Sequence, residues 1–226
     1  MGAFQGFGRQ ALPFFKALKF HQSREWFEEN RALHESEVLG PFTALIDDLT
    51  AEFQKRKVPL KGEGRKSIFR IHRDVRFSKD KSPYKTHAGA VMTRSGGKGE
   101  QGLLYLHIDP EGCFVAAGFH MLEPPQLSAM REAIRRKREL IEKMEMELLK
   151  AKLAFSTSEG FQMKRLPRGY EAFKDSPLSG ALRLKSFIVE EAVTDKLVAS
   201  PKLTGKVVEF TERAMPLLEY GWAALG

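Results

Sequence analysis

The chain has 226 residues and a formal net charge of +8, with 42% apolar and 29% charged residues. These proportions are ordinary for a globular protein, and no apolar run approaches the ~20 residues that a membrane span needs. We expect one domain, residues 1–226, and no membrane partner. Because Cys113 is the single cysteine and no signal-peptide pattern is apparent, we expect a cytoplasmic protein without a disulfide.

The spacing of apolar residues is helical from about residue 10 to residue 57. Leu12, Phe15 and Leu18 predict a short first helix, and Ser23 stands where it would cap a second one. Pro41 predicts the start of a third helix, whose apolar residues repeat at three and four positions.

The middle of the chain alternates between apolar and polar residues, as strands do. We expect strands at 88–93, 103–109 and 113–121, and their short connections imply antiparallel pairing. Residues 69–77 alternate as well and predict a further strand. One side of that strand would carry Phe69, Ile71, Arg73, Val75 and Phe77, and the other Arg70, His72, Asp74 and Arg76.

Helical spacing returns at Pro124, with Lys137 interrupting the apolar stripe, so that one long helix or two consecutive helices are expected. Residues 161–185 mix loops and short elements, and residues 193–226 end the chain with helix. The predicted fold is therefore α+β. It has N-terminal helices, a central antiparallel sheet of at least four strands, and C-terminal helices packed on the sheet.

The basic charge is concentrated between Phe69 and Thr86. Three arginines and three lysines stand there against two aspartates, which gives a net charge of +4, half of the total. A basic protein favours phosphate-bearing partners over cationic ones. This motif therefore predicts a site for an anionic ligand.

Two blocks of the chain resemble a known family. The first runs from Arg70 to Lys85 and reads RIHRDVRFSKDKSPYK; the second combines Leu166 to Tyr170 with Pro177 and with Leu182 to Phe187. Together with Arg24 to Phe27, they resemble the bacterial, fungal and plant family called domain of unknown function 2461, over nearly the whole chain. The resemblance implies an α+β domain with the first block in its middle, and it implies no particular activity, cofactor or substrate.

The site hypothesis joins the basic residues of both blocks around one concave surface. Arginine suits two-pronged binding of phosphate, and lysine supplies a mobile charge. The alternative is that Arg73 and Arg76 pair with Asp74 and Asp80, so that the motif serves the fold. The expected ligand-binding residues are Arg70, Arg73, Arg76, Lys79, Lys81, Lys85, Arg168, Arg183 and Lys185.

The reaction, if there is one, stays open at this stage. Asp74, Asp80 and His72 are candidate acids or bases beside a bound phosphate, but their spacing does not select an enzyme. The six histidines lack the paired helical spacings of zinc sites, and we expect no metal and no cofactor, although His107 and His120 could approach each other on adjacent strands. An anionic small molecule, a nucleic acid and a purely structural scaffold role all remain open, as does the oligomeric state.

Overall fold

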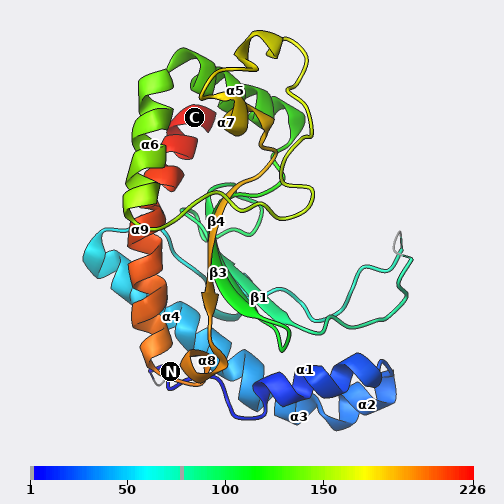
Figure 1. Ribbon diagram of the computed structural model, residues 1–226. Coiled ribbons are helices and arrows are strands. Elements are labelled where there is room, and N and C mark those ends of the chain that lie inside the picture. Colours follow the sequence, from blue (N-terminus) through cyan, green and yellow to red (C-terminus); the bar gives the residue numbers. More distant parts are fainter. Residues whose placement is uncertain (1–2, 77–78) are drawn as a thin grey trace. The chain divides into compact units, whose positions relative to one another are not determined.

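The computed structural model describes residues 3–76 and 79–226 and has the predicted α+β fold (Figure 1). Its antiparallel sheet contains β1 (Ala88–Met92), β2 (Leu103–Ile108), β3 (Cys113–Phe119) and β4 (Phe187–Val193), in the order β1-β2-β3-β4. The three predicted strands are confirmed with small differences at their ends. Within the described residues, no helix has both the length and the apolar character that crossing a membrane requires.

The chain divides into two compact units, each built from several stretches of sequence. The first contains residues 1–99, 104–115 and 192–209, and the second contains residues 100–103, 116–191 and 210–226. Each unit is described by itself below. The expectation of a single domain stays a prediction.

The N-terminal helices of the first unit follow the sequence pattern closely. They are α1 (Ala11–Phe20), α2 (Arg24–Glu29), α3 (Arg31–His34), a π-helix (Glu35–Leu39) and α4 (Gly40–Arg56). The Ser23 hydroxyl accepts the backbone N–H of Trp26 at 3.2 Å, so the predicted cap is confirmed. Phe15 of α1 and Phe42 of α4 are fully buried and anchor these helices in the core. Short helices at Gly64–Ser67 and at α8 (Asp195–Val198) complete this unit.

The second unit contains α5 (Pro124–Arg136), α6 (Arg138–Lys150), a 3-10 turn (Glu171–Phe173), α7 (Ser179–Arg183) and most of α9 (Lys202–Leu225). The break falls at Lys137, so the second of the two expected arrangements is confirmed. α9 packs closely on β3, because a side chain at Gly221 would collide with the Phe119 ring. Within the second unit, the end of the C-terminal helix therefore packs against the end of β3.

One predicted strand is wrong. Residues 69–76 belong to no strand of the sheet; His72 makes an isolated bridge to Tyr84, and the fourth strand is β4 instead. The physical reason lies in burial: Phe69 is 36% exposed, and Ile71 and Val75 are only partly buried. Alternating apolar and polar residues do not form a sheet strand when the apolar side has no core to pack against. Phe77, which was assigned to the same apolar side, lies outside the described residues.

Candidate anion-binding site

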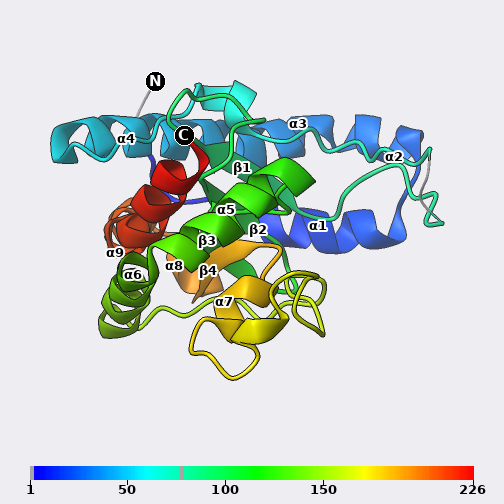
Figure 2. The same cartoon turned by 90° about the horizontal axis from the view of Figure 1, so that it is seen from above.

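Residues 68–76 and 79–90 form a two-armed ribbon, here called the basic ribbon. The backbone N–H groups of Phe69, Arg73 and Lys85 donate hydrogen bonds of 2.8 Å to the carbonyls of Gly89, Pro83 and Ile71. Figures 1 and 2 show the ribbon leaving β1 and extending alongside the N-terminal helices. The basic motif is therefore carried on an extension of the sheet edge.

The two arms of the ribbon differ in length between their bridges. Ile68 pairs with Ala90 and His72 pairs with Tyr84, so three residues on the outgoing arm lie opposite five on the returning arm. The two extra positions form a bulge between Tyr84 and Ala90. A bulge of this kind bends the strand and changes the direction of the side chains beside it.

Tyr84 anchors the ribbon to the helices. Its ring is 4% exposed and stacks on Phe27 of α2 with ring centroids 4.6 Å apart, and its backbone N–H donates to the Gln22 side chain at 3.0 Å. The His72 ring lies 5.2 Å from the Tyr84 ring and 6.1 Å from the Phe27 ring. His72 thus has aromatic neighbours, and its part in a reaction stays a prediction.

The tip of the ribbon, residues 73–76 and 79–82, contains its own ion pairs. Arg76 donates from Nε and Nη2 to the two carboxylate oxygens of Asp74 at 2.9 and 2.7 Å, and Arg73 pairs with Asp80. Hydrogen bonds from Ser82, and after them the pairing with Arg73, lower the pKa of Asp80 to about 2. Pairing with Arg76 similarly lowers the pKa of Asp74. Both carboxylates are therefore ionised at neutral pH and already engaged, which disfavours them as general acids.

The tip also contains two lysines, Lys79 and Lys81. Lys81 donates to the backbone carbonyl of Val75 at 2.9 Å, so it ties the two arms together. Lys79 is exposed. The tip therefore resembles the structural alternative considered for the motif, in which its arginines serve the local fold.

The base of the ribbon is different. Phe69 is flanked by the ammonium groups of Lys85 and Lys98, at 5.5 and 5.3 Å from the ring centroid, and Arg70 is the next residue along the chain. We call Arg70, Lys85 and Lys98 the cationic cluster. Among the described residues, none of these three side chains is hydrogen-bonded to a carboxylate; Lys98 donates to the backbone carbonyl of Ile68 at 2.6 Å.

Burial acts on both lysines of the cluster, and repulsion by other cations acts on Lys85. Burial, and after it the positive charges of Arg70, Lys98 and Arg73, lowers the pKa of Lys85. Burial also lowers the pKa of Lys98. Cations that are crowded in this way are stabilised by any anion that comes between them. Lys98 was not among the predicted residues, and its position in a glycine-rich turn gave no signal of a site.

A hollow of about 530 Å³ opens beside the cluster and lies within the first unit. Phe69, Arg70 and Lys98 line one part of it. The other lining residues are Phe27, Arg31, His34, Glu35, Leu39, Arg65, Ile68, Ile71 and His72.

Some charged groups that line the hollow have ion-pair partners among the described residues, and others do not. Arg65 forms a two-pronged pair with Glu35 at 2.8 and 2.7 Å, and Arg31 forms one with Glu28 at 2.8 and 2.6 Å. His34 is 5% exposed, and burial lowers its pKa to about 4, so that it is neutral at pH 7. Positive charge without a local partner is therefore concentrated on the side of the hollow that the cluster forms.

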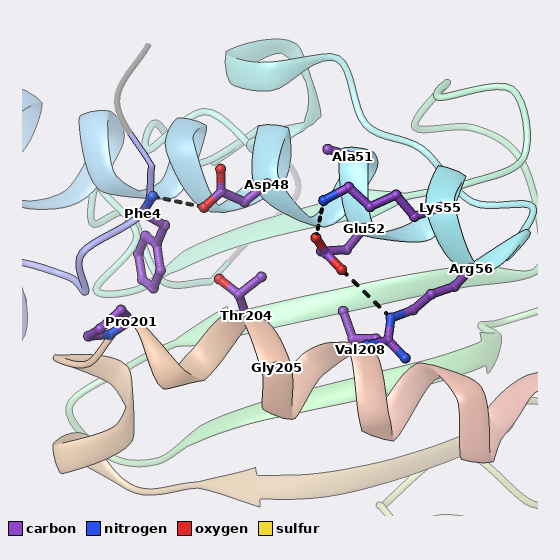
Figure 3. Close-up of a pocket in the computed structure, with 10 residues that line it drawn as sticks. All are labelled: Phe4, Asp48, Ala51, Glu52, Lys55, Arg56, Pro201, Thr204, Gly205 and Val208. Atoms are coloured by element: carbon purple, nitrogen blue, oxygen red, sulfur yellow. Dashed lines mark hydrogen bonds and ion pairs between the residues drawn. The ribbon is translucent and has the colours of Figure 1, made fainter.

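A second hollow of about 360 Å³ lies between α4 and the first turns of α9 (Figure 3). Most of its charged groups are ion-paired or hydrogen-bonded within the protein. Glu52 pairs with Lys55 at 2.6 Å and with Arg56 at 3.7 Å, and Asp48 accepts the backbone N–H of Phe4 at 2.8 Å. This hollow consequently offers a ligand less unsatisfied charge than the cationic cluster does.

The second signature block lies in the second unit. Arg168 is exposed in a turn, Arg183 donates to the Ser179 carbonyl at 3.3 Å, and Lys185 is partly buried. Arg131 of α5 donates to the carbonyls of Leu182 and Leu184 at 3.1 and 3.4 Å and so holds this block in place. The structure thus distributes the nine predicted residues over the two units, and their union into one site stays a prediction.

The comparisons with known proteins agree with the motifs. No curated protein and no solved structure matches the chain. Residues 10–220 match the family described as conserved hypothetical protein (DUF2461), and these residues include the whole basic ribbon and the second block. The chain therefore belongs to the DUF2461 family.

Proposed function

We propose that the protein binds a small anionic molecule carrying a phosphate group, and that the cationic cluster holds this group. One observation carries the proposal: the ammonium groups of Lys85 and Lys98 lie over the Phe69 ring, the charge of Arg70 acts on Lys85, and among the described residues no carboxylate is hydrogen-bonded to any of these three cations. A phosphate would accept hydrogen bonds from the Arg70 guanidinium and from both ammonium groups. Such charge-assisted bonds are about twice as strong as neutral ones.

The hollow beside the cluster favours a compact ligand over a long polyanion. Its volume of about 530 Å³ lies within the range of small-molecule sites. The rings of Phe27 and Phe69 line it and offer apolar surface to the rest of the ligand. A nucleic acid would instead need several phosphate contacts along a surface, and the arginines at the tip of the ribbon are already paired.

A screen by thermal shift tests the proposal. We expect stabilisation by one class among inorganic phosphate, pyrophosphate, sugar phosphates and nucleotides, because a ligand that binds the folded state raises the melting temperature. Titration calorimetry with the best ligand should then give an affinity that falls about tenfold or more in Lys85→Ala and Lys98→Ala, since each loses a charged hydrogen bond.

Lys143→Ala is the matched control, because Lys143 is an exposed lysine on α6 with an ion pair to Glu147 at 3.8 Å. It removes the same charge and should leave the affinity unchanged. Equal weakening in all three variants would show a general charge effect and would contradict a specific site. A steep dependence of affinity on salt, with oligonucleotides as the best ligands, would favour a nucleic-acid surface instead.

No observation favours a particular reaction, and an enzymatic role stays an open alternative. The cytoplasmic location stays a prediction.

A further inference from the structure

Three side chains of the first unit that the sequence did not connect lie together at the edge of β2. His107 lies in β2, Asp109 directly follows that strand, and His87 directly precedes β1. Ala88 pairs with Ile108 in the antiparallel register, so the next pair outward brings His87 opposite Asp109. One potential ligand atom from each of the three lies within 4.8 Å of those from the other two.

The distances between these atoms fit a shared metal ion better than hydrogen bonds. Asp109 Oδ2 stands 3.4 Å from His107 Nε2 and 3.8 Å from His87 Nδ1. Both distances exceed the usual N–H···O range of about 2.7–3.2 Å. Two ligands that are each about 2.0–2.1 Å from a tetrahedral metal ion lie roughly 3.4 Å apart. The distance from Asp109 to His107 therefore matches the spacing of metal ligands, and the distance from Asp109 to His87 is somewhat longer.

Neighbouring groups fix the orientation of two of the three side chains. The Tyr105 hydroxyl is hydrogen-bonded to His107 Nδ1 at 2.9 Å, which leaves Nε2 directed at Asp109. The backbone N–H of Glu111 donates to Asp109 Oδ1 at 2.8 Å, which leaves Oδ2 for the histidines. Such outer contacts are typical of metal sites, where they orient the ligands.

The local backbone makes room for this arrangement. Gly89 pairs with His107 across the sheet, and a side chain at Gly89 would collide with the Tyr105 hydroxyl. The Phe114 ring of β3 stacks on the His107 imidazole with centroids 4.5 Å apart. The glycine therefore admits Tyr105, and Phe114 supports the face of the ring.

We propose that His87, His107 and Asp109 bind one divalent first-row transition-metal ion, such as zinc, with at least one coordination position open to water or a ligand. Two imidazoles and one carboxylate are a donor set that zinc and ferrous iron accept in proteins. The side chain of His87 is 32% exposed, so an ion can enter from solvent. The proposal is independent of the proposed anion site, because its ligands differ from the cationic cluster.

Metal binding by the untagged full chain tests this proposal. After treatment with a chelator and its removal, calorimetric titration with zinc should give one ion per chain with a submicromolar Kd. Cobalt(II) should give the intense visible bands of a four- or five-coordinate site and should be displaced by zinc. His87→Ala and Asp109→Asn should each weaken zinc binding at least tenfold, and Tyr105→Phe should weaken it less.

His21→Ala is the matched control, because His21 is an exposed histidine stacked on Trp26 and away from the three ligands in sequence. It should bind zinc as the wild type does. Melting curves in chelator identify any variant that fails to fold, and Asp109→Asn keeps nearly the shape of the side chain. Absence of stoichiometric zinc and cobalt binding in the wild type, or undiminished binding in both His87→Ala and Asp109→Asn, would overturn the proposal.

Discussion

Both ends of the basic ribbon carry cations, but these cations differ in their pairing with carboxylates. At the tip, Arg73 and Arg76 are paired with Asp80 and Asp74. At the base, Lys85 and Lys98 lie around Phe69 with their pKa values lowered, and no carboxylate among the described residues bonds to them. A stretch of basic sequence can thus contain both cations that are paired with carboxylates and cations that are not.

Burial differs between the two ends as well. Tyr84, near the base, is buried against α2, whereas every described residue of the tip is exposed or only partly buried. The base is held by the core of the unit, and the tip is held by contacts within the ribbon. Substitutions should therefore affect stability and binding at the base, and neither strongly at the tip.

The largest effect is expected for Tyr84→Ala. Removing a buried aromatic side chain that stacks on Phe27 should lower the free energy of unfolding by about 3–5 kcal/mol, measured by urea denaturation. Val75→Ala, at the partly buried tip, should cost less than about 1 kcal/mol. Equal costs would show that the ribbon is not anchored through Tyr84.

Arginine substitutions separate the two ends by their effect on binding. Arg70→Ala should lower the affinity for the best phosphate ligand about tenfold or more, because the substitution removes a charged donor from the cluster. Arg76→Ala should change the affinity less than about twofold, since Arg76 is paired with Asp74. Calorimetry of both variants measures the difference. A larger loss in Arg76→Ala would place the ligand at the tip and refute the assignment of the site to the base.

As the pH falls, protonation of histidines should lower the stability of the folded state before the carboxylates of the tip become protonated. The pKa of His34 is about 4 in the folded protein and about 6.5 when unfolded, so the unfolded chain binds more protons between these values. Stability should consequently fall as the pH decreases from about 6.5 to about 4, and His34 alone contributes up to about 1.4 kcal/mol per pH unit.

The His34→Leu variant isolates this contribution. Urea denaturation at several pH values should show a shallower loss of stability in the variant than in the wild type; the remaining slope comes from other histidines with lowered pKa values, such as His87 and His120. An identical pH dependence in the two proteins would mean that His34 is not a neutral core residue.

The smallest effect is expected for Asp80→Asn. Its ion pair with Arg73 is exposed, and exposed pairs contribute little. The melting temperature at neutral pH should stay close to that of the wild type. Because the pKa of Asp80 is lowered to about 2, the contribution of its charge is present above about pH 4 and disappears as the pH falls through about 2. A marked destabilisation at neutral pH would show that the tip is more than locally paired.

Local patterns predicted most of the fold. The Ser23 cap and the three strands from β1 to β3 follow from spacing and turn residues, because these depend on near neighbours, and the break at Lys137 is one of the two arrangements that the spacing allows. β4 was missed. Its apolar start, Phe187 to Val189, is followed by two glutamates, and its place beside β3 depends on residues nearly 70 positions away. The sequence alone contained no local signal for that pairing.

The candidate sites were less predictable for a related reason. The basic motif was visible as charge, but which of its cations are paired depends on side-chain geometry, and Lys98 comes from another turn. The group of His87, His107 and Asp109 depends on the register of β1 and β2, whereas the zinc-ligand spacings that can be recognised in a sequence lie along single helices. Composition indicates the kind of chemistry, and tertiary pairing selects the residues.

The bulge on the returning arm of the ribbon limits how the length of this segment can vary. Side chains alternate along an extended arm, and the two extra positions between Tyr84 and Ala90 leave that alternation in phase on both sides. A chain with one residue fewer there would turn either the aromatic anchor or the edge of β1 to the opposite face. Insertions or deletions of two residues in this stretch should therefore be tolerated. The insertion or deletion of one residue should destabilise the protein as much as the loss of the Tyr84 side chain does.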